Sequence, residues 1–263
     1  ELNHASIVEG RRLSFASYLK YKHNDMKSLE AVLKKIPYES TKLIVMDGVF
    51  SMEGDIAKLP EIVALADKYN ASVYVDEAHS LGVFGQEGRG ICNHFGLTDR
   101  VDLIMGTFSK SLATIGGFIA TDAETINFLK HHSRSYIFSA SISPAATASV
   151  IAALDVIKQE PERIKNLWEI TNYSLSAFRS LGFEIGNTQT PIIPLYIRDM
   201  DKTFAITQEL YEQGVFVNPV IPPACSPDDT LIRFSLMATH TKAQIDEAVE
   251  KLTATFKKYE IIR

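Results

Sequence analysis

Four short runs of apolar, often β-branched residues set the pattern of the first half of the chain. They are KLIVMDGVF (42–50), ASVYVDEAH (71–79), VDLIMGT (101–107) and IGGFIATD (115–122), each bounded by Gly, Asp or Ser. Runs of this length and composition are typical of buried strands. The sequence therefore predicts four buried strands in this region.

The segment between the first two runs has the spacing of an amphipathic helix. In LPEIVALADKYN (59–70) one helical face carries Leu59, Ile62, Val63, Leu65 and Ala66. Pro60 suits the first turn of such a helix. Strand, helix and strand in this order form a parallel crossover, so we expect an α/β fold with a mainly parallel sheet.

The second half of the chain predicts a different arrangement. Residues 143–182 are helical in pattern, and we expect two helices separated near Pro161. There follow PIIPLYI (191–197), a helix from about 201 to 213, VFVNPVIPP (215–223), TLIRFSLMA (230–238) and a last helix from Thr241 to about Tyr259. This order is typical of a small α+β domain. We therefore expect part of a large domain over 1–158 and a small C-terminal domain over 159–263.

The composition and charge disfavour a partner made of nucleic acid. Hydrophobic residues make up 46% of the chain, which is normal for a folded protein, and the formal net charge is −5. A nucleic-acid-binding protein usually carries a basic surface, so we expect no such partner. The longest apolar runs are also shorter than the ~18 to 20 residues of a membrane helix, and we expect no transmembrane segment.

The cysteines and the first residues bear on cellular context. Cys92 and Cys225 lie far apart without a Cys-x-x-Cys pair, so we expect neither zinc nor a disulfide. Two free thiols fit a reducing compartment, and we predict a cytoplasmic protein. The opening ELNHASIVEGRR shows no initiator Met, no apolar signal core and no evident helix start. We therefore expect this chain to be a piece of a longer protein.

The stretch YVDEAHS (74–80) resembles the acidic box of a helicase, but the companion motif fails. A nucleotide-binding loop needs G-x-x-x-x-G-K-[ST] upstream of the box. The nearest match, IMGTFSKS (104–111), has Ile104 and Ser109 at the two glycine positions and lies downstream. The sequence therefore disfavours a helicase.

A metal site in the same stretch is also disfavoured. Asp76, Glu77, His79 and His94 are the candidate ligands. On a continuous strand, Asp76 and His79 point to opposite faces, so they converge only if the strand ends between them. No further His or Asp stands at ligand spacing, and we predict no metal.

An organic cofactor explains these residues better. Lys110 follows the strand that ends at Thr107, and open parallel sheets bind ligands at the carboxyl ends of their strands. Asp76, His79 and Lys110 would then meet at one edge. A Lys that forms a Schiff base and an Asp that keeps a pyridine nitrogen protonated are what pyridoxal 5'-phosphate requires. The hydroxyls of Thr107 and Ser109 suit its phosphate.

Five motifs together resemble the α-oxoamine synthases, fold-type I pyridoxal phosphate enzymes. They are NHASIVEG, DGVFSMEGDIAKL, VDEAHSLGVFGQEGRG, GTFSKSLATIGGF and LIRFSLMATHT, in the family's order, and the resemblance runs from Leu2 to about residue 255. It implies that Lys110 is the Schiff-base lysine and the base for the α-proton. It implies further that Asp76 binds the pyridine nitrogen and His79 the 3'-oxygen of the ring.

The resemblance implies roles for residues outside this edge as well. His4 would stack on the cofactor face and bind the carboxylate of the amino acid, and Ser51 would lie near the 3'-oxygen. Arg233 would clamp the substrate carboxylate, because a guanidinium binds a carboxylate bidentately. In IFSASISP (137–144), Ser139 and Ala140 match the segment that reaches the phosphate of a neighbouring subunit. We therefore expect a homodimer with shared active sites.

Within the family, GTFSKS and PVIPPACSPDDTLIRFSLMATHT are most similar to the serine palmitoyltransferase branch. That branch condenses L-serine with a long-chain acyl-CoA, palmitoyl-CoA, to 3-ketodihydrosphingosine, CoA and CO2. Two alternatives stay open: another α-oxoamine synthase that uses glycine or alanine, and a non-catalytic regulatory subunit of the same fold. Lys110 argues against the second, because such subunits usually lack the lysine. The family also implies an amino-terminal part before the NHAS motif.

Overall fold

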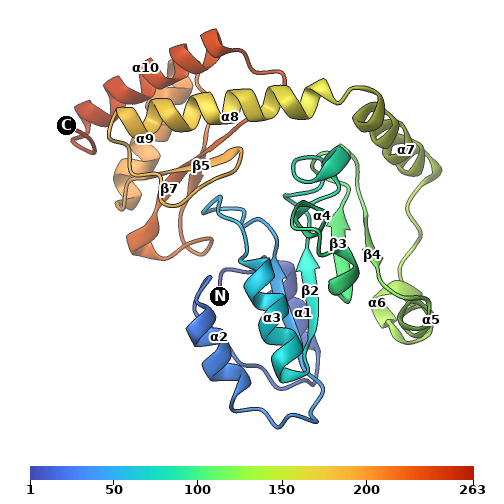
Figure 1. The fold of residues 1–263 in the computed structure, drawn as a ribbon. Coiled ribbons are helices and arrows are strands. Elements are labelled where there is room, and N and C mark those ends of the chain that lie inside the picture. The colour runs from blue at the N-terminus through green and yellow to red at the C-terminus, as the bar shows by residue number, and fades with distance from the viewer. The chain divides into compact units, whose positions relative to one another are not determined.

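A computed structural model describes residues 1–263, and its ribbon is shown in Figure 1. The chain divides into two compact units. The first unit comprises Glu1–Phe50 and Ala57–Glu160, and the second comprises Ser51–Ile56 and Pro161–Arg263. No helix is both long and apolar enough to cross a membrane.

The first unit is built on a four-stranded sheet in the order β1-β2-β3-β4. Its strands are β1 (Leu43–Asp47), β2 (Ser72–Asp76), β3 (Leu103–Thr107) and β4 (Gly117–Ala120). The first three are parallel, and β4 is antiparallel to β3. The α/β fold with a mainly parallel sheet is thereby confirmed. The prediction of a buried fourth strand was wrong, because β4 forms an edge of this sheet and both its end residues are exposed.

Seven α-helices belong to this unit. They are α1 (Ala5–Leu13), α2 (Met26–Leu33), α3 (Leu59–Tyr69), α4 (Ile91–His94), α5 (Ala123–His132), α6 (Arg134–Ile137) and α7 (Pro144–Gln159), with short 3₁₀ turns at Gln86–Gly88 and Thr98–Arg100. The crossover helix α3 runs along β2 (Figure 1). Leu59, Ile62, Val63 and Ala66 of its predicted apolar face are buried, and Leu65 is half-buried. It ends at Asn70, whose positive φ of 52° closes the helix in the left-handed conformation.

The helix α1 corrects the expectation that the first residues contain no helix start. Its N-cap is His4, whose ring nitrogen Nδ1 accepts a hydrogen bond from the backbone N–H of Ser6. The usual N-cap residues are Ser, Thr, Asp and Asn, so the helix signal was hidden in an unusual residue type.

The second unit has the predicted α+β order. It contains α8 (Glu162–Ser180), β5 (Ile192–Tyr196), α9 (Met200–Glu212), β6 (Asn218–Val220), a 3₁₀ turn at Pro227–Asp229, β7 (Leu231–Ser235) and α10 (Lys242–Lys258). The strands form an antiparallel sheet in the order β5-β7-β6. The predicted break near Pro161 is confirmed, since α7 ends at Gln159 and α8 begins at Glu162. The last helix begins with a full capping box of Thr241 and Gln244.

Candidate active site at the carboxyl ends of the parallel strands

The carboxyl ends of the parallel strands bring two buried carboxylates together. Asp47 ends β1 and Asp76 ends β2, and the two residues are register partners. Each is only 3% exposed. Register partners on parallel neighbours project to the same face, so both carboxylates lie on one side of one sheet edge.

The strand β2 ends where the sequence argument required it to end. The backbone leaves the strand after Asp76 and turns through Ala78–Ser80. The N–H of Glu77 still donates to the carbonyl of Met105 on β3, at 2.8 Å. His79 therefore lies in the turn, half-buried, and is free of the strand alternation that would have pointed it away from Asp76.

The pKa of the Asp76 carboxyl reflects both its burial and its neighbours. Burial raises the pKa of its carboxyl above the ordinary value. The N–H of Ala78, which donates to Oδ1 at 2.8 Å, and the electrostatic influence of Lys110 and His4 oppose that rise in pKa. The structure therefore brings Asp76, Lys110 and His4 together at this edge.

Lys110 lies in the loop that joins β3 to β4. Its amine is exposed, and Nζ donates to Oγ1 of Thr107 at 3.4 Å. The loop is held by its own backbone, because the N–H of Phe108 donates to the carbonyl of Gly116 at 2.9 Å and the N–H of Thr114 donates to that of Phe108 at 2.9 Å. The amine of Lys110 is thus carried on a loop that is held by backbone hydrogen bonds. Ser109, next to it, is also exposed.

The loop that carries His79 is fastened to the loop that carries Lys110. The hydroxyl of Ser111 donates to the carbonyl of Leu81 at 2.6 Å. The close contact between these two loops requires glycine at position 82, where φ is +78° and a Cβ would lie 2.5 Å from the Cβ of Ser111. His79 and Lys110 are therefore held in a fixed relation.

Glu77 has a structural role. It is 1% exposed, and its carboxylate accepts the backbone N–H groups of Ile91 and Cys92 at 2.7 Å each and the hydroxyl of Ser80. The first two bonds cap the amino end of α4. The carboxylate also occupies the space next to Gly90, where a Cβ would lie 2.4 Å from Oε2. Glu77 thus fixes the turn that carries His79 to the start of α4.

Asp47 is a residue of this edge that sequence reasoning missed. Both of its carboxylate oxygens lie 3.2 Å from the backbone nitrogen of His4, which donates to them. The neighbouring Asn3 donates to the carbonyl of Val45 at 2.8 Å, so the chain before α1 is fastened to the end of β1. A signal was present, because Asp47 follows its apolar run as Asp76 follows its own.

Ser139 and Ala140 lie between α6 and α7 and are exposed. The hydroxyl of Ser139 donates to the carbonyl of Ser135, a local contact. The contact of Ser139 and Ala140 with a phosphate of a neighbouring subunit stays a prediction.

Arg233 and Ser51 belong to the second unit. Arg233 lies on β7, the central strand of its sheet, and its Nη1 donates to the backbone carbonyl of Ser51 at 3.3 Å. Its Nε is buried without a hydrogen-bond partner, and burial lowers the pKa of the guanidinium. A partly desolvated cation with an unused donor is suited to a carboxylate ligand.

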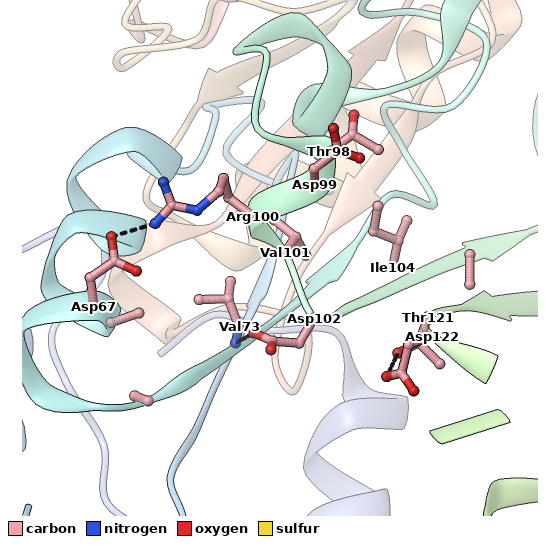
Figure 2. Close-up of a pocket in the computed structure, with 13 residues that line it drawn as sticks. Asp67, Val73, Thr98, Asp99, Arg100, Val101, Asp102, Ile104, Thr121 and Asp122 are labelled. Carbon is pink, nitrogen blue, oxygen red and sulfur yellow. Dashed lines mark hydrogen bonds and ion pairs between the residues drawn. The ribbon is translucent and has the colours of Figure 1, made fainter. Parts of the chain in front are cut away.

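A hollow of about 510 Å³ lies at the other end of the parallel strands of the first unit, as Figure 2 shows. Of the four carboxylates that line it, three already have hydrogen-bond or ion-pair partners. Asp67 pairs with Arg100 at 2.6 Å, Asp102 accepts the N–H of Val73 at 2.7 Å, and Asp122 caps α5. The hollow lies at the amino ends of β2 and β3, away from every residue predicted to be catalytic.

Comparison with known proteins gives consistent matches over the whole chain. Residues 1–252 match the family Aminotransferase class I and II. The serine palmitoyltransferase of Bacteroides ovatus is 65% identical over 260 residues, which are 99% of this chain and 66% of that protein. The 8-amino-7-oxononanoate synthase of Thermosipho melanesiensis is 45% identical over 262 residues, which are 100% of this chain and 67% of that protein.

A solved structure gives the same result. A variant serine palmitoyltransferase from S. paucimobilis with bound PLP–myriocin aldimine superposes with a TM-score of 0.95 at 34% identity, covering 99% of this chain and 66% of that one. The chain thus spans just under two thirds of the length of the serine palmitoyltransferases it matches.

Proposed function

The chain belongs to the aminotransferase class I and II family and, within it, to the α-oxoamine synthases, and from this premise we propose a serine palmitoyltransferase function. The proposed protein binds pyridoxal 5'-phosphate and condenses L-serine with a long-chain acyl-CoA, palmitoyl-CoA, to 3-ketodihydrosphingosine, CoA and CO2. The observation that carries the proposal is the convergence of Asp76, Lys110 and His4 at one strand edge.

The residues of the edge fit this cofactor. Asp76 is a buried carboxylate that has few local donors, and a protonated pyridine nitrogen would supply one. Lys110 offers an exposed amine within the same electrostatic neighbourhood, as a covalent attachment to an aldehyde requires. When bound, pyridoxal phosphate supplies a ring that accepts the electrons of a carbanion.

The chain's own residues divide the remaining work. Lys110 would hold the cofactor through Nζ and, once released, take the α-proton of L-serine at the same nitrogen. His79 would donate to the 3'-oxygen of the ring and to the thioester oxygen of the acyl-CoA. A positioned donor of this kind is worth about 2.7 to 4 kcal/mol in other enzymes.

Substrate and phosphate contacts complete the proposal. Arg233 and His4 would bind the carboxylate of L-serine, and the desolvated guanidinium of Arg233 supports that role. Thr107 and Ser109 would donate their hydroxyls to the cofactor phosphate, and Ser51 would lie near the 3'-oxygen. Ser139 and Ala140 would reach the phosphate of the other subunit in a homodimer with shared sites.

The proposal places the protein in the cytoplasm. Its two cysteines, Cys92 and Cys225, are both free thiols, which fits a reducing compartment. The regulatory-subunit alternative is disfavoured because Lys110 is present on its loop. The use of glycine or alanine remains the alternative within the family, favoured by the match to an 8-amino-7-oxononanoate synthase and disfavoured by that protein's lower identity.

The visible absorption spectrum of the full-length protein with pyridoxal phosphate tests the proposal. We expect a yellow band that shifts with L-serine and hardly with glycine or L-alanine. Borohydride reduction should place the cofactor on Lys110, and Lys110→Ala should abolish turnover, whereas Lys130→Ala, on an exposed position of α5, should not. A colourless protein, or appreciable turnover by Lys110→Ala, would contradict the proposal.

A further inference from the structure

We propose that Asp47 is a positioning residue that fixes His4 at the cofactor edge through a bond to the His4 backbone, an inference that rests on the proposed function. Both carboxylate oxygens of Asp47 accept the N–H of His4 at 3.2 Å, and its side chain is 3% exposed. A desolvated carboxylate that accepts one N–H through both oxygens holds its donor in a defined place.

The pairing of β1 with β2 determines the position of Asp47. Asp47 and Asp76 are register partners at the ends of β1 and β2, so their side chains share one face. Asp76 is the residue proposed to hold the pyridine nitrogen. An anchor one strand away places His4 beside the same cofactor, and His4 lies near enough to Asp76 to act on its carboxyl electrostatically.

A second contact fixes the imidazole ring of His4. Its Nδ1 lies 3.3 Å from the backbone nitrogen of Ser6 and 2.8 Å from the Ser6 hydroxyl. A backbone N–H can only donate, so Nδ1 is the acceptor and the ring N–H is on Nε2. Asp47 holds the backbone and Ser6 selects the tautomer. The exposed ring then has Nε2–H as its donor for a ligand carboxylate.

The residue type at position 47 is costly unless it serves such a purpose. Two buried carboxylates on adjacent strands repel each other. The environment is also poor in water: burial, followed by the charge of Asp47, raises the pKa of Tyr21 to about 12. Burial also raises the pKa of Tyr74 to about 12, with the charges of Asp76 and Asp47 contributing. A neutral acceptor would satisfy the His4 N–H at lower cost, whereas a carboxylate at the amino end of α1 makes the bond stronger.

Two measurements test the inference. The first is hydrogen exchange of the amides at the start of α1 in the full-length protein without cofactor. The second is the dissociation constant for L-serine, read from the visible spectrum of the loaded protein. For Asp47→Ala we expect exchange faster by about tenfold or more and serine binding weaker by about tenfold. Asp47→Asn, which keeps one acceptor oxygen, should be intermediate.

Asp25→Ala is the matched control. Asp25 caps α2 of the same unit by accepting the N–H of Ser28 at 2.9 Å. Its removal should speed exchange at α2 and leave the dissociation constant for L-serine unchanged. If Asp25→Ala weakened serine binding as much as Asp47→Ala, the effect would be general loss of stability and the inference would be wrong.

The His4→Ala background separates positioning from other effects. If Asp47 acts through His4, Asp47→Ala should change serine affinity by less than about twofold in that background. An equal factor in both backgrounds, or unchanged exchange at α1 in Asp47→Ala, overturns the inference. Failure of the wild-type protein to take up pyridoxal phosphate overturns the proposed function instead, and the exchange measurement still decides whether Asp47 anchors His4.

Discussion

Glu77→Gln isolates the contribution of a buried carboxylate that neighbours Asp76 in the sequence and caps the start of α4. The carboxylate accepts the N–H groups of Ile91 and Cys92, one on each oxygen, and the Ser80 hydroxyl. A glutamine of the same shape has only one acceptor oxygen. Whichever way its amide is turned, one buried backbone N–H faces an NH2 group and loses its acceptor.

The size of the effect follows from these bonds. An unsatisfied buried N–H costs about 1 to 3 kcal/mol, and a hydrogen bond to a neutral acceptor is about half as strong as one to a charged acceptor. We therefore expect Glu77→Gln to lower the free energy of unfolding by about 3 kcal/mol. For a chain of this size that corresponds to a Tm lower by about 6 to 12 °C.

Urea unfolding of the full-length protein without cofactor measures this directly. The midpoint should fall while the dependence on denaturant stays unchanged. Glu87→Gln is the matched control, because Glu87 is exposed and its partner Arg89 lies at the surface, where an ion pair is worth little. A Glu77→Gln protein within about 0.5 kcal/mol of wild type would refute the capping argument.

Three further changes test other parts of the site. Asp76→Asn should cripple turnover far more than Glu77→Gln does at a temperature where both are folded, and equal losses would contradict the division of roles between them. Without cofactor, Asp76→Asn should be more stable than wild type near pH 8. Burial raises the pKa of Asp76, so the wild-type protein has its full stability below the unfolded pKa of about 4 and loses stability as the pH rises through the folded pKa. The stability advantage, measured by urea unfolding, should vanish near pH 4. Gly82→Ala should weaken cofactor binding because its Cβ would strike Ser111 at a φ of +78°, and Ser111→Gly should restore part of the loss; no restoration would argue against the contact. Arg233→Lys should raise the KM for L-serine by more than about tenfold, because a lysine cannot bind a carboxylate bidentately, whereas Arg198→Lys, in an exposed pair with Glu184, should not.

The parts of the fold and site that could be predicted from sequence are those that depend on local pattern. The strands and α3 follow from runs of apolar residues and a 3.6-residue period. Asp76 ends a strand, and His79 and Lys110 each lie three residues after a strand end, so these residues stand out. Parallel strands end at one edge, so the sequence already implied that these side chains approach each other. The structure adds the fastening of their loops through Ser111.

The parts that could not be predicted depend on contacts distant in sequence. Asp47 acts on a backbone N–H 43 residues away, and a backbone donor leaves no side-chain pattern. The helix α1 was missed because its cap is a histidine ring. Residues 51–56 join the second unit through bonds such as that from the Thr188 hydroxyl to the carbonyl of Gly54, at 3.0 Å, which no local pattern indicates.

The register of two strands also links the stability of this fold to its proposed ligand. Pairing Asp47 with Asp76 concentrates negative charge in a buried place, and burial raises the pKa of Asp76 even with Lys110 and His4 nearby. A ligand that presents a protonated nitrogen to Asp76 would offset that cost in the folded state alone. Ligand binding that is specific to the folded state must stabilise it. The residues that make this buried edge electrostatically costly would therefore be the same residues that favour a cofactor with a basic ring nitrogen.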